Sequence, residues 1–114
     1  MQGEHSGSQS REDIFTAMTE LRDKIDAVDE KLLVLLNQRA GFATDIGHIK
    51  RGEGMEIYVP SREKQVLEHV QASNPGPLRN DAIRRLFERI IDESRRLEQE
   101  RAAELRSANN DMSE

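Results

Sequence analysis

A repeating pattern of apolar residues constrains this chain more than any other feature of its sequence. Between residues 14 and 51, apolar side chains recur at steps of three, four and seven: Leu21, Ile25, Val28, Leu32, Leu35, Phe42, Ile46 and Ile49. This heptad spacing is typical of a helix that buries one stripe against other helices. A helix of roughly 37 residues would be about 55 Å long.

Two further helices and no strand are predicted after this segment. The glycines of RGEG end the first helix, and Pro60 suits the first turn of a second helix that ends near 72. The prolines of SNPGP break the chain before a third helix, from about 80 to 103. The predicted fold class is therefore all-α, with one long, one short and one medium helix per chain.

The ends of the chain differ from its middle. Residues 1–13 are polar and rich in Gly, Ser and Gln, so we expect a disordered N-terminal extension. Residues 104–114 lack a sustained apolar stripe, so we expect a frayed or disordered tail. A single domain is thereby predicted over residues 14–103.

Composition excludes several classes of protein. The formal net charge of −5 argues against nucleic-acid binding, and no apolar run reaches the roughly 18 residues of a membrane span. The absence of Cys excludes disulfide scaffolds, thiolate metal sites and Cys nucleophiles. Because nothing in the first residues resembles an export signal, we expect a cytoplasmic protein.

The length of the first helix predicts a second subunit. A helix of about 55 Å cannot enclose a core with one short helix and one of about 36 Å. Its apolar stripe would remain in water, and exposed patches of that size mark interfaces. We therefore expect an intertwined homodimer that shares the long helices, although an extended coiled coil would bury the same stripe.

Arg39 occupies the missing position of the heptad pattern. Ala43, Gly47 and Lys50 continue its helical face, so two small residues separate two cations. This arrangement leaves a slot for a small molecule with more than one negative charge. The alternative is an Arg that reaches the surface or pairs with a Glu of another helix. Because Gly47 costs about 1 kcal/mol relative to Ala within a helix, we expect close helix packing there or a ligand on the backbone.

Three polar residues lie on or beside the apolar stripes of the later helices. Ser94 and Glu98 are one turn apart on the third helix, and Glu63 shares the inner face of the second. Each is either a site residue or part of a solvated rim. No phosphate-binding loop, metal motif or nucleophile–base pair is present, so we expect chemistry without metal or cofactor, driven by charge and shape.

Arg22 is ambiguous on its own. It lies about 100° around the helix from Arg39, so one chain cannot bring both to one site without distortion. A partner subunit could supply it, whereas an ordinary ion pair with Asp26 is the alternative.

Four motifs in order, LRDKIDAVDEKLLVLLNQR, IGHIK, YVPSRE and FERIIDESRRLE, resemble the all-helical, type II class of chorismate mutases. The resemblance covers about residues 18–100. It implies an intertwined dimer with two sites, each of which takes residues from both chains. It also implies a cofactor-free Claisen rearrangement of chorismate, a dianion, to prephenate in phenylalanine and tyrosine biosynthesis.

The resemblance assigns the catalytic roles. Arg39 and the partner chain's Arg22 match arginines that bind the two substrate carboxylates. Lys50 matches a lysine that bonds a carboxylate and the ether oxygen. Glu98 lies where members of the family carry Gln or Glu as the second donor to that oxygen.

The resemblance also assigns residues that bind the rest of the substrate. Arg62 matches a site arginine, and Glu63 matches the glutamate that holds the ring hydroxyl. Ser94 matches a serine near a carboxylate. Val59 stands where some members have an Asp whose backbone N–H helps hold the hydroxyl, so its backbone is the predicted contact.

Two other functions stay open at this point. A pyruvate lyase acting on isochorismate would use the same fold and charged slot, although Glu98 and the RRLE sequence favour the mutase. A non-catalytic helical dimer that regulates another enzyme would be expected to have a broken slot, and here the slot is complete. Because the predicted domain leaves no room for a regulatory domain, we expect any feedback control to need a regulatory partner enzyme.

Overall fold

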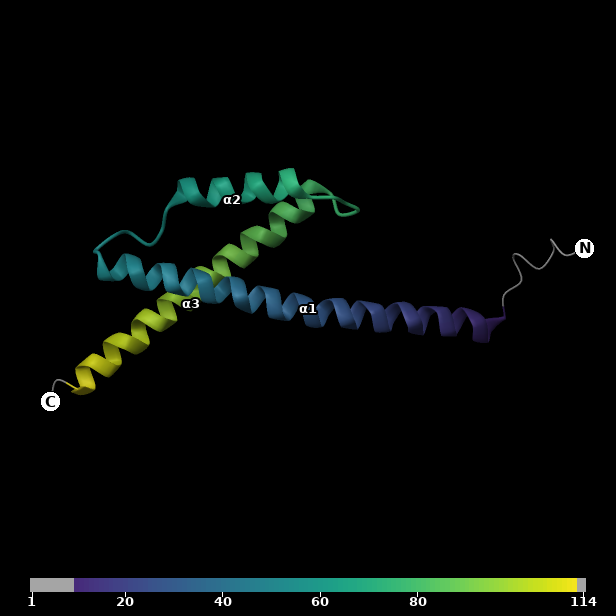
Figure 1. Ribbon diagram of the computed structural model, residues 1–114, viewed down its shortest axis with the longest axis horizontal. Coiled ribbons are helices and arrows are strands. Elements are labelled where there is room, and N and C mark those ends of the chain that lie inside the picture. Colours follow the sequence, from purple (N-terminus) through teal and green to yellow (C-terminus); the bar gives the residue numbers. More distant parts are fainter. Residues whose placement is uncertain (1–9, 113–114) are drawn as a thin grey trace, which may run out of the picture. The chain divides into compact units, whose positions relative to one another are not determined.

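The structure is a computed structural model that describes residues 10–112 (Figure 1). It contains α1 (Arg11–Gly52), α2 (Pro60–Ser73) and α3 (Asn80–Met112). No strand occurs among the described residues, which confirms the all-α prediction of three helices. The disorder expected for residues 1–9, 113 and 114 lies outside the described range. The domain limits at 14 and 103 stay predictions.

The first turn of α1 is capped by a side chain. Ser10 Oγ accepts a hydrogen bond of 3.0 Å from the backbone N–H of Asp13. Glu12 and Asp13 place negative charge in the first turn, where the helix dipole favours it. The helix therefore begins at Arg11, slightly before the apolar stripe from which its start near Ile14 was predicted.

A glycine ends α1. Gly54 has φ +69°, the left-handed conformation that a Cβ disfavours. Met55 N–H donates to the carbonyl of Lys50 at 2.8 Å, and Gly54 N–H donates to that of Arg51 at 3.3 Å. This pair of bonds is a Schellman motif, which satisfies the last carbonyls of the helix.

The starts of α2 and α3 follow from local chemistry. Pro60 occupies the first turn of α2 after Val59, whose backbone is extended. Before α3, Asn74 Nδ2 donates to Leu78 O at 2.7 Å and to Asn80 Oδ1 at 2.8 Å. These bonds hold the loop closed, and α2 packs against α3 on either side of it (Figure 1).

The third helix is longer than the sequence predicted. It continues to Met112 instead of ending near Ala103. No Gly or Pro interrupts the segment from Gln99 to Met112, and the segment contains good helix formers such as Ala, Leu, Glu and Arg. The prediction relied on the apolar stripe, whose loss does not by itself end a helix.

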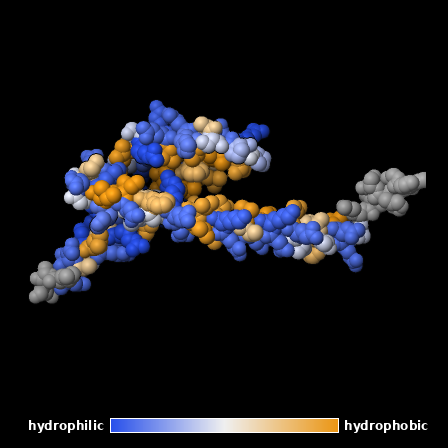
Figure 2. Space-filling model, viewed as in Figure 1, coloured by the Kyte–Doolittle hydropathy of each residue, from blue (hydrophilic) through white to orange (hydrophobic). Residues whose placement is uncertain are grey.

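The chain divides into two compact units, Met1–Asn37 and Gln38–Glu114. The described part of the first unit is one stretch of α1, and Figure 2 shows hydrophobic residues gathered along its upper edge. Its apolar side chains are at least 40% exposed: Ile14, Phe15, Met18, Leu21, Ile25, Val28, Leu32, Leu33, Val34, Leu35 and Leu36. No helix of the described chain is long and apolar enough to cross a membrane.

Candidate functional site

A pocket of about 270 Å³ lies within the second unit. Its walls come from the last turns of α1, the connector 53–59, α2 and α3. Its size suits a small molecule rather than a polymer. Seven of the residues predicted as site residues line this pocket: Arg39, Lys50, Val59, Arg62, Glu63, Ser94 and Glu98.

Arg39 is half-buried on the α1 side of the pocket. Its Nη1 donates a hydrogen bond of 3.3 Å to Ser94 Oγ on α3. Burial and the nearby charge of Arg62 both lower the pKa of Arg39, yet a guanidinium remains protonated in proteins. Two like charges are thus held beside one pocket, and a bound anion would relieve both the repulsion and the loss of hydration.

Lys50 lies further along α1, next to the connector. Its Nζ is 3.4 Å from the carbonyl oxygen of Ile57, to which it donates. Because an ammonium group has three donors, others remain for a ligand in the pocket. The contact also ties the connector to α1 beside the pocket.

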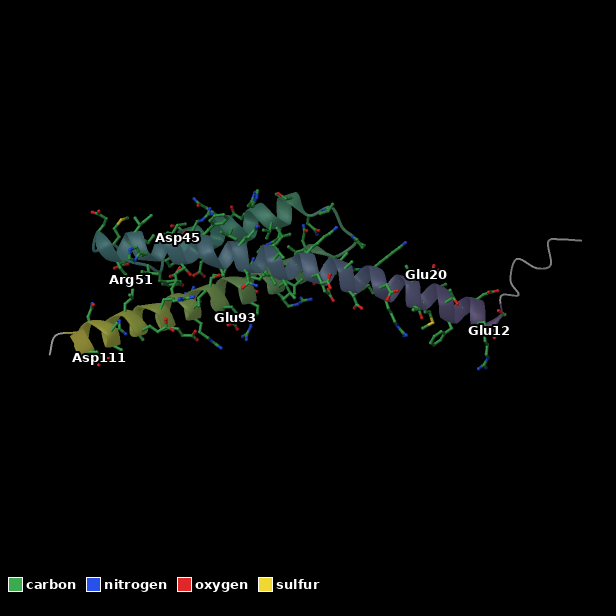
Figure 3. All side chains as sticks on the ribbon, turned by 60° about the horizontal axis from the view of Figure 1, so that its bottom comes forward. Glu12, Glu20, Asp45, Arg51, Glu93 and Asp111 are labelled. Atoms are coloured by element: carbon green, nitrogen blue, oxygen red, sulfur yellow. The ribbon has the colours of Figure 1, made fainter. Side chains whose placement is uncertain are left out.

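Glu98 packs directly against Gly47. Gly47 is buried, and a Cβ added there would lie 3.1 Å from Glu98 Cδ and 3.3 Å from its Cγ. The close approach of α3 therefore accounts for a glycine inside α1, one of the two reasons that the sequence suggested. Figure 3 shows Arg51 between α1 and α3 and Glu93 on the opposite side of α3.

The environment of Glu98 stabilises its protonated form more than water does for an ordinary glutamate. Burial raises the pKa of Glu98, while Lys50, Arg51 and Arg95 lower it by less, so that the net shift is upward. The carboxyl group therefore keeps its proton to a higher pH than an ordinary glutamate. A protonated carboxyl group can donate a hydrogen bond, whereas a carboxylate can only accept one.

Arg95 and Tyr58 line the pocket but were not among the predicted site residues. Arg95 Nη2 forms an ion pair with Glu63 Oε2, and its guanidinium carbon lies 4.4 Å from the centre of the Tyr58 ring. Sequence reasoning missed Arg95 because it belongs to an arginine-rich stretch in which local acidic partners are plentiful. Its only signal was its place next to Ser94.

Arg22 is placed differently from the other predicted residues. It belongs to the first unit, on α1, and its side chain is exposed. That it reaches a site from a partner subunit stays a prediction.

The charges around the pocket favour an anionic ligand. Two of the lining charges cancel in the Arg95–Glu63 ion pair, and an ionised Glu98 would offset only one of the three remaining cations. Arg39, Lys50 and Arg62 then leave an excess of positive charge. Among residues 10–112, no cluster of three His, Cys, Asp or Glu residues could hold a metal ion.

Known proteins are similar to this chain in sequence. The family described as chorismate mutase type II matches residues 21–99. A bifunctional chorismate mutase/prephenate dehydratase of Pseudomonas aeruginosa is 43% identical over an alignment of 84 residues, and the match covers 69% of this chain and 23% of that protein. One of Neisseria gonorrhoeae is 43% identical over 72 residues, 63% of this chain and 19% of that protein. The chain thus spans less than a quarter of the length of these relatives.

A solved structure has the same fold. Chorismate mutase (form II) from Thermus thermophilus superposes with a TM-score of 0.71 at 35% sequence identity. The match covers 73% of this chain and 94% of that one.

Proposed function

Because the chain belongs to the type II chorismate mutase family, we propose that it catalyses the rearrangement of chorismate to prephenate in aromatic amino acid biosynthesis. The observation that carries this proposal is the excess of cationic side chains in one small pocket, from Arg39, Lys50 and Arg62. Chorismate is a small dianion, and its charge and size match that pocket.

The first task of the site is orientation. Chorismate is flexible and reacts only in a chair-like conformer that brings the two reacting carbons together. Arg39 binds one carboxylate next to Ser94, and the partner subunit's Arg22 binds the other. Holding both ends fixes the reactive conformer before the bond changes begin, which removes an entropic part of the barrier.

The second task is charge stabilisation. The ether C–O bond breaks ahead of C–C bond formation, so negative charge grows on the ether oxygen in the transition state. Lys50 and protonated Glu98 donate hydrogen bonds to that oxygen. These bonds strengthen as the charge develops, so they stabilise the transition state more than the substrate. The net reaction transfers no proton, so no general base is needed.

The remaining residues bind the ring hydroxyl of chorismate and add positive charge to the pocket. The Glu63 carboxylate accepts a hydrogen bond from the ring hydroxyl, and the Val59 backbone N–H donates one to it. Arg62 adds positive charge at the exposed side of the pocket.

A homodimer completes the proposal. Its support is the row of exposed apolar side chains between Ile14 and Leu36, which needs a covering surface. Each of two sites then combines the second unit of one chain with Arg22 of the other. The printed names of the bifunctional relatives join the mutase to a prephenate dehydratase, so we propose that a prephenate-consuming enzyme uses the product.

An assay with two substrates tests this proposal. The purified protein is incubated with chorismate, the loss of chorismate absorbance is followed, and the product is identified by NMR. We expect prephenate without release of pyruvate. A parallel incubation with isochorismate monitors pyruvate, because a lyase would release it. Absence of chorismate turnover, or faster pyruvate release from isochorismate, would contradict the mutase assignment.

A further inference from the structure

Arg95 joins three elements at the edge of the pocket. Its side chain comes from α3, pairs with Glu63 on α2 and covers Tyr58 in the connector. We propose that Arg95 is a positioning residue that neutralises Glu63 and holds the connector and α2 in place as a wall of the pocket. The inference deepens the proposed function and rests on it for its kinetic part.

The geometry of Arg95 sets it apart from the other arginines of α3. The Arg95 and Glu63 side chains are only 33% and 29% exposed, whereas Arg89 and Arg96 are 67% and 62% exposed. Arg89 and Arg96 each pair with Glu93 on their own helix. Such exposed local pairs contribute little, but a partly buried pair between two helices fixes their relative position.

The contact with Tyr58 extends this link to the connector. A guanidinium over an aromatic ring at this distance is attracted to the negative face of the ring. Ile57, Tyr58 and Val59 all line the pocket, and Lys50 donates a hydrogen bond to the carbonyl of Ile57. The connector is therefore contacted by a cation of α1 and by a cation of α3.

The ion pair also has an electrostatic consequence. Glu63 lines a pocket that must accept a dianion, and an unpaired carboxylate there would repel it. Arg95 cancels that charge while leaving a carboxylate oxygen to accept the ring hydroxyl. Loss of Arg95 should therefore weaken substrate binding more than it slows the bound substrate.

A double-mutant cycle tests the electrostatic part. Arg95→Ala should raise KM by about tenfold, as for loss of a charged hydrogen bond, with a smaller change in kcat. In a Glu63→Gln background the same substitution should raise KM by less than about threefold, because no carboxylate of Glu63 is then left unpaired in the pocket. The other partner of Arg95, Asp92 at 3.6 Å, is 60% exposed and does not line the pocket, so the loss of that pair should matter little. Equal effects in the two backgrounds would overturn the proposal, since a merely structural arginine would not distinguish them.

Two further variants serve as controls. Arg96→Ala removes the same charge one residue away and should leave KM and kcat within about twofold, as for an exposed pair. Arg95→Lys keeps the charge without the planar guanidinium and should recover most of the loss in KM. If Arg95→Lys were as poor as Arg95→Ala in a folded protein, charge compensation would not be the cause.

A readout independent of activity separates this proposal from the proposed function. Tyr58 is the only Tyr, and the chain has no Trp, so ultraviolet emission reports on this residue alone. Arg95→Ala should increase quenching of that emission by acrylamide, while Arg96→Ala should not. If the wild-type protein were inactive but Arg95→Ala and Arg96→Ala still differed in quenching, the proposed mutase activity would be refuted. The proposed contact between Arg95 and the connector would stand. Unchanged quenching in Arg95→Ala would refute the link.

Discussion

Arg39 occupies a position that the heptad pattern reserves for an apolar side chain. Truncation should therefore spare the fold and remove a charged contact to the substrate. We expect Arg39→Ala to lose about 2–5 kcal/mol of transition-state binding, which is the usual cost of removing one partner of a buried charge pair. Measured kcat/KM should fall accordingly, with an unchanged circular dichroism spectrum. A decrease in kcat/KM of less than about tenfold would show that Arg39 does not contact the substrate.

The raised pKa of Glu98 predicts that the activity depends on pH. Its pKa is raised, so its proton is present at low pH and is lost as the pH rises through that pKa. The ionised form cannot donate to the ether oxygen and repels the charge that grows there. Measured kcat/KM should therefore fall on the alkaline side, which gives an optimum shifted toward acid.

Two variants test whether Glu98 causes this alkaline limb, the fall in kcat/KM at high pH. Glu98→Gln has a permanent donor of similar shape, so it should keep substantial activity and flatten the limb. Glu98→Ala should be poor at every pH, because Lys50 alone would then stabilise the oxygen. If wild type and Glu98→Gln showed the same alkaline limb, another group would be responsible for it.

Gly47 and Gly41 allow a matched comparison on one helix. Ala at either position should gain up to about 1 kcal/mol of helix propensity. A Cβ at 47 would displace Glu98, whereas one at 41 would meet nothing within 4 Å. Gly47→Ala should therefore lower kcat/KM severalfold, while Gly41→Ala keeps full activity and raises the melting temperature. Equal activity in the two variants would show that the packing of Glu98 on Gly47 is not needed.

The sequence was informative at single residues where a local rule was broken. Arg39 and Gly47 conflict with an apolar or helical pattern. Arg39 lines the pocket, and Gly47 packs against Glu98, which also lines it. Arg95 breaks no such rule. Its partner Glu63 is 32 positions away along the chain, so only tertiary packing distinguishes it from Arg96.

At the scale of helices, the end of α1 determines how the connector enters the pocket wall. Gly54→Ala would place a Cβ on a left-handed residue and should lower the free energy of unfolding by about 1–2 kcal/mol. Gly52→Ala is the control, because Gly52 lies in α1 with no atom near its Cβ position. Urea unfolding of the two variants measures the difference. Equal stabilities would mean that the Schellman motif is not maintained in solution.

Helix starts and ends were predictable where Gly or Pro marks them. Pro60 and the RGEG segment marked the start of α2 and the end of α1. The end of α3 was not marked in this way, since residues beyond Ala103 favour a helix without contributing an apolar stripe. The periodicity of apolar residues indicates which face of a helix is buried. It therefore underestimates the length of a helix that continues into solvent.

At the scale of the whole molecule, the central claim is a site shared between two chains. It is tested by refolding Arg22→Ala and Arg39→Ala proteins together. A mixed dimer has one site with both arginines intact and one site with neither, so it should recover up to about half of the wild-type activity per dimer. Each variant refolded alone should stay nearly inactive. Proven subunit exchange without recovered activity would show that each site is built from one chain.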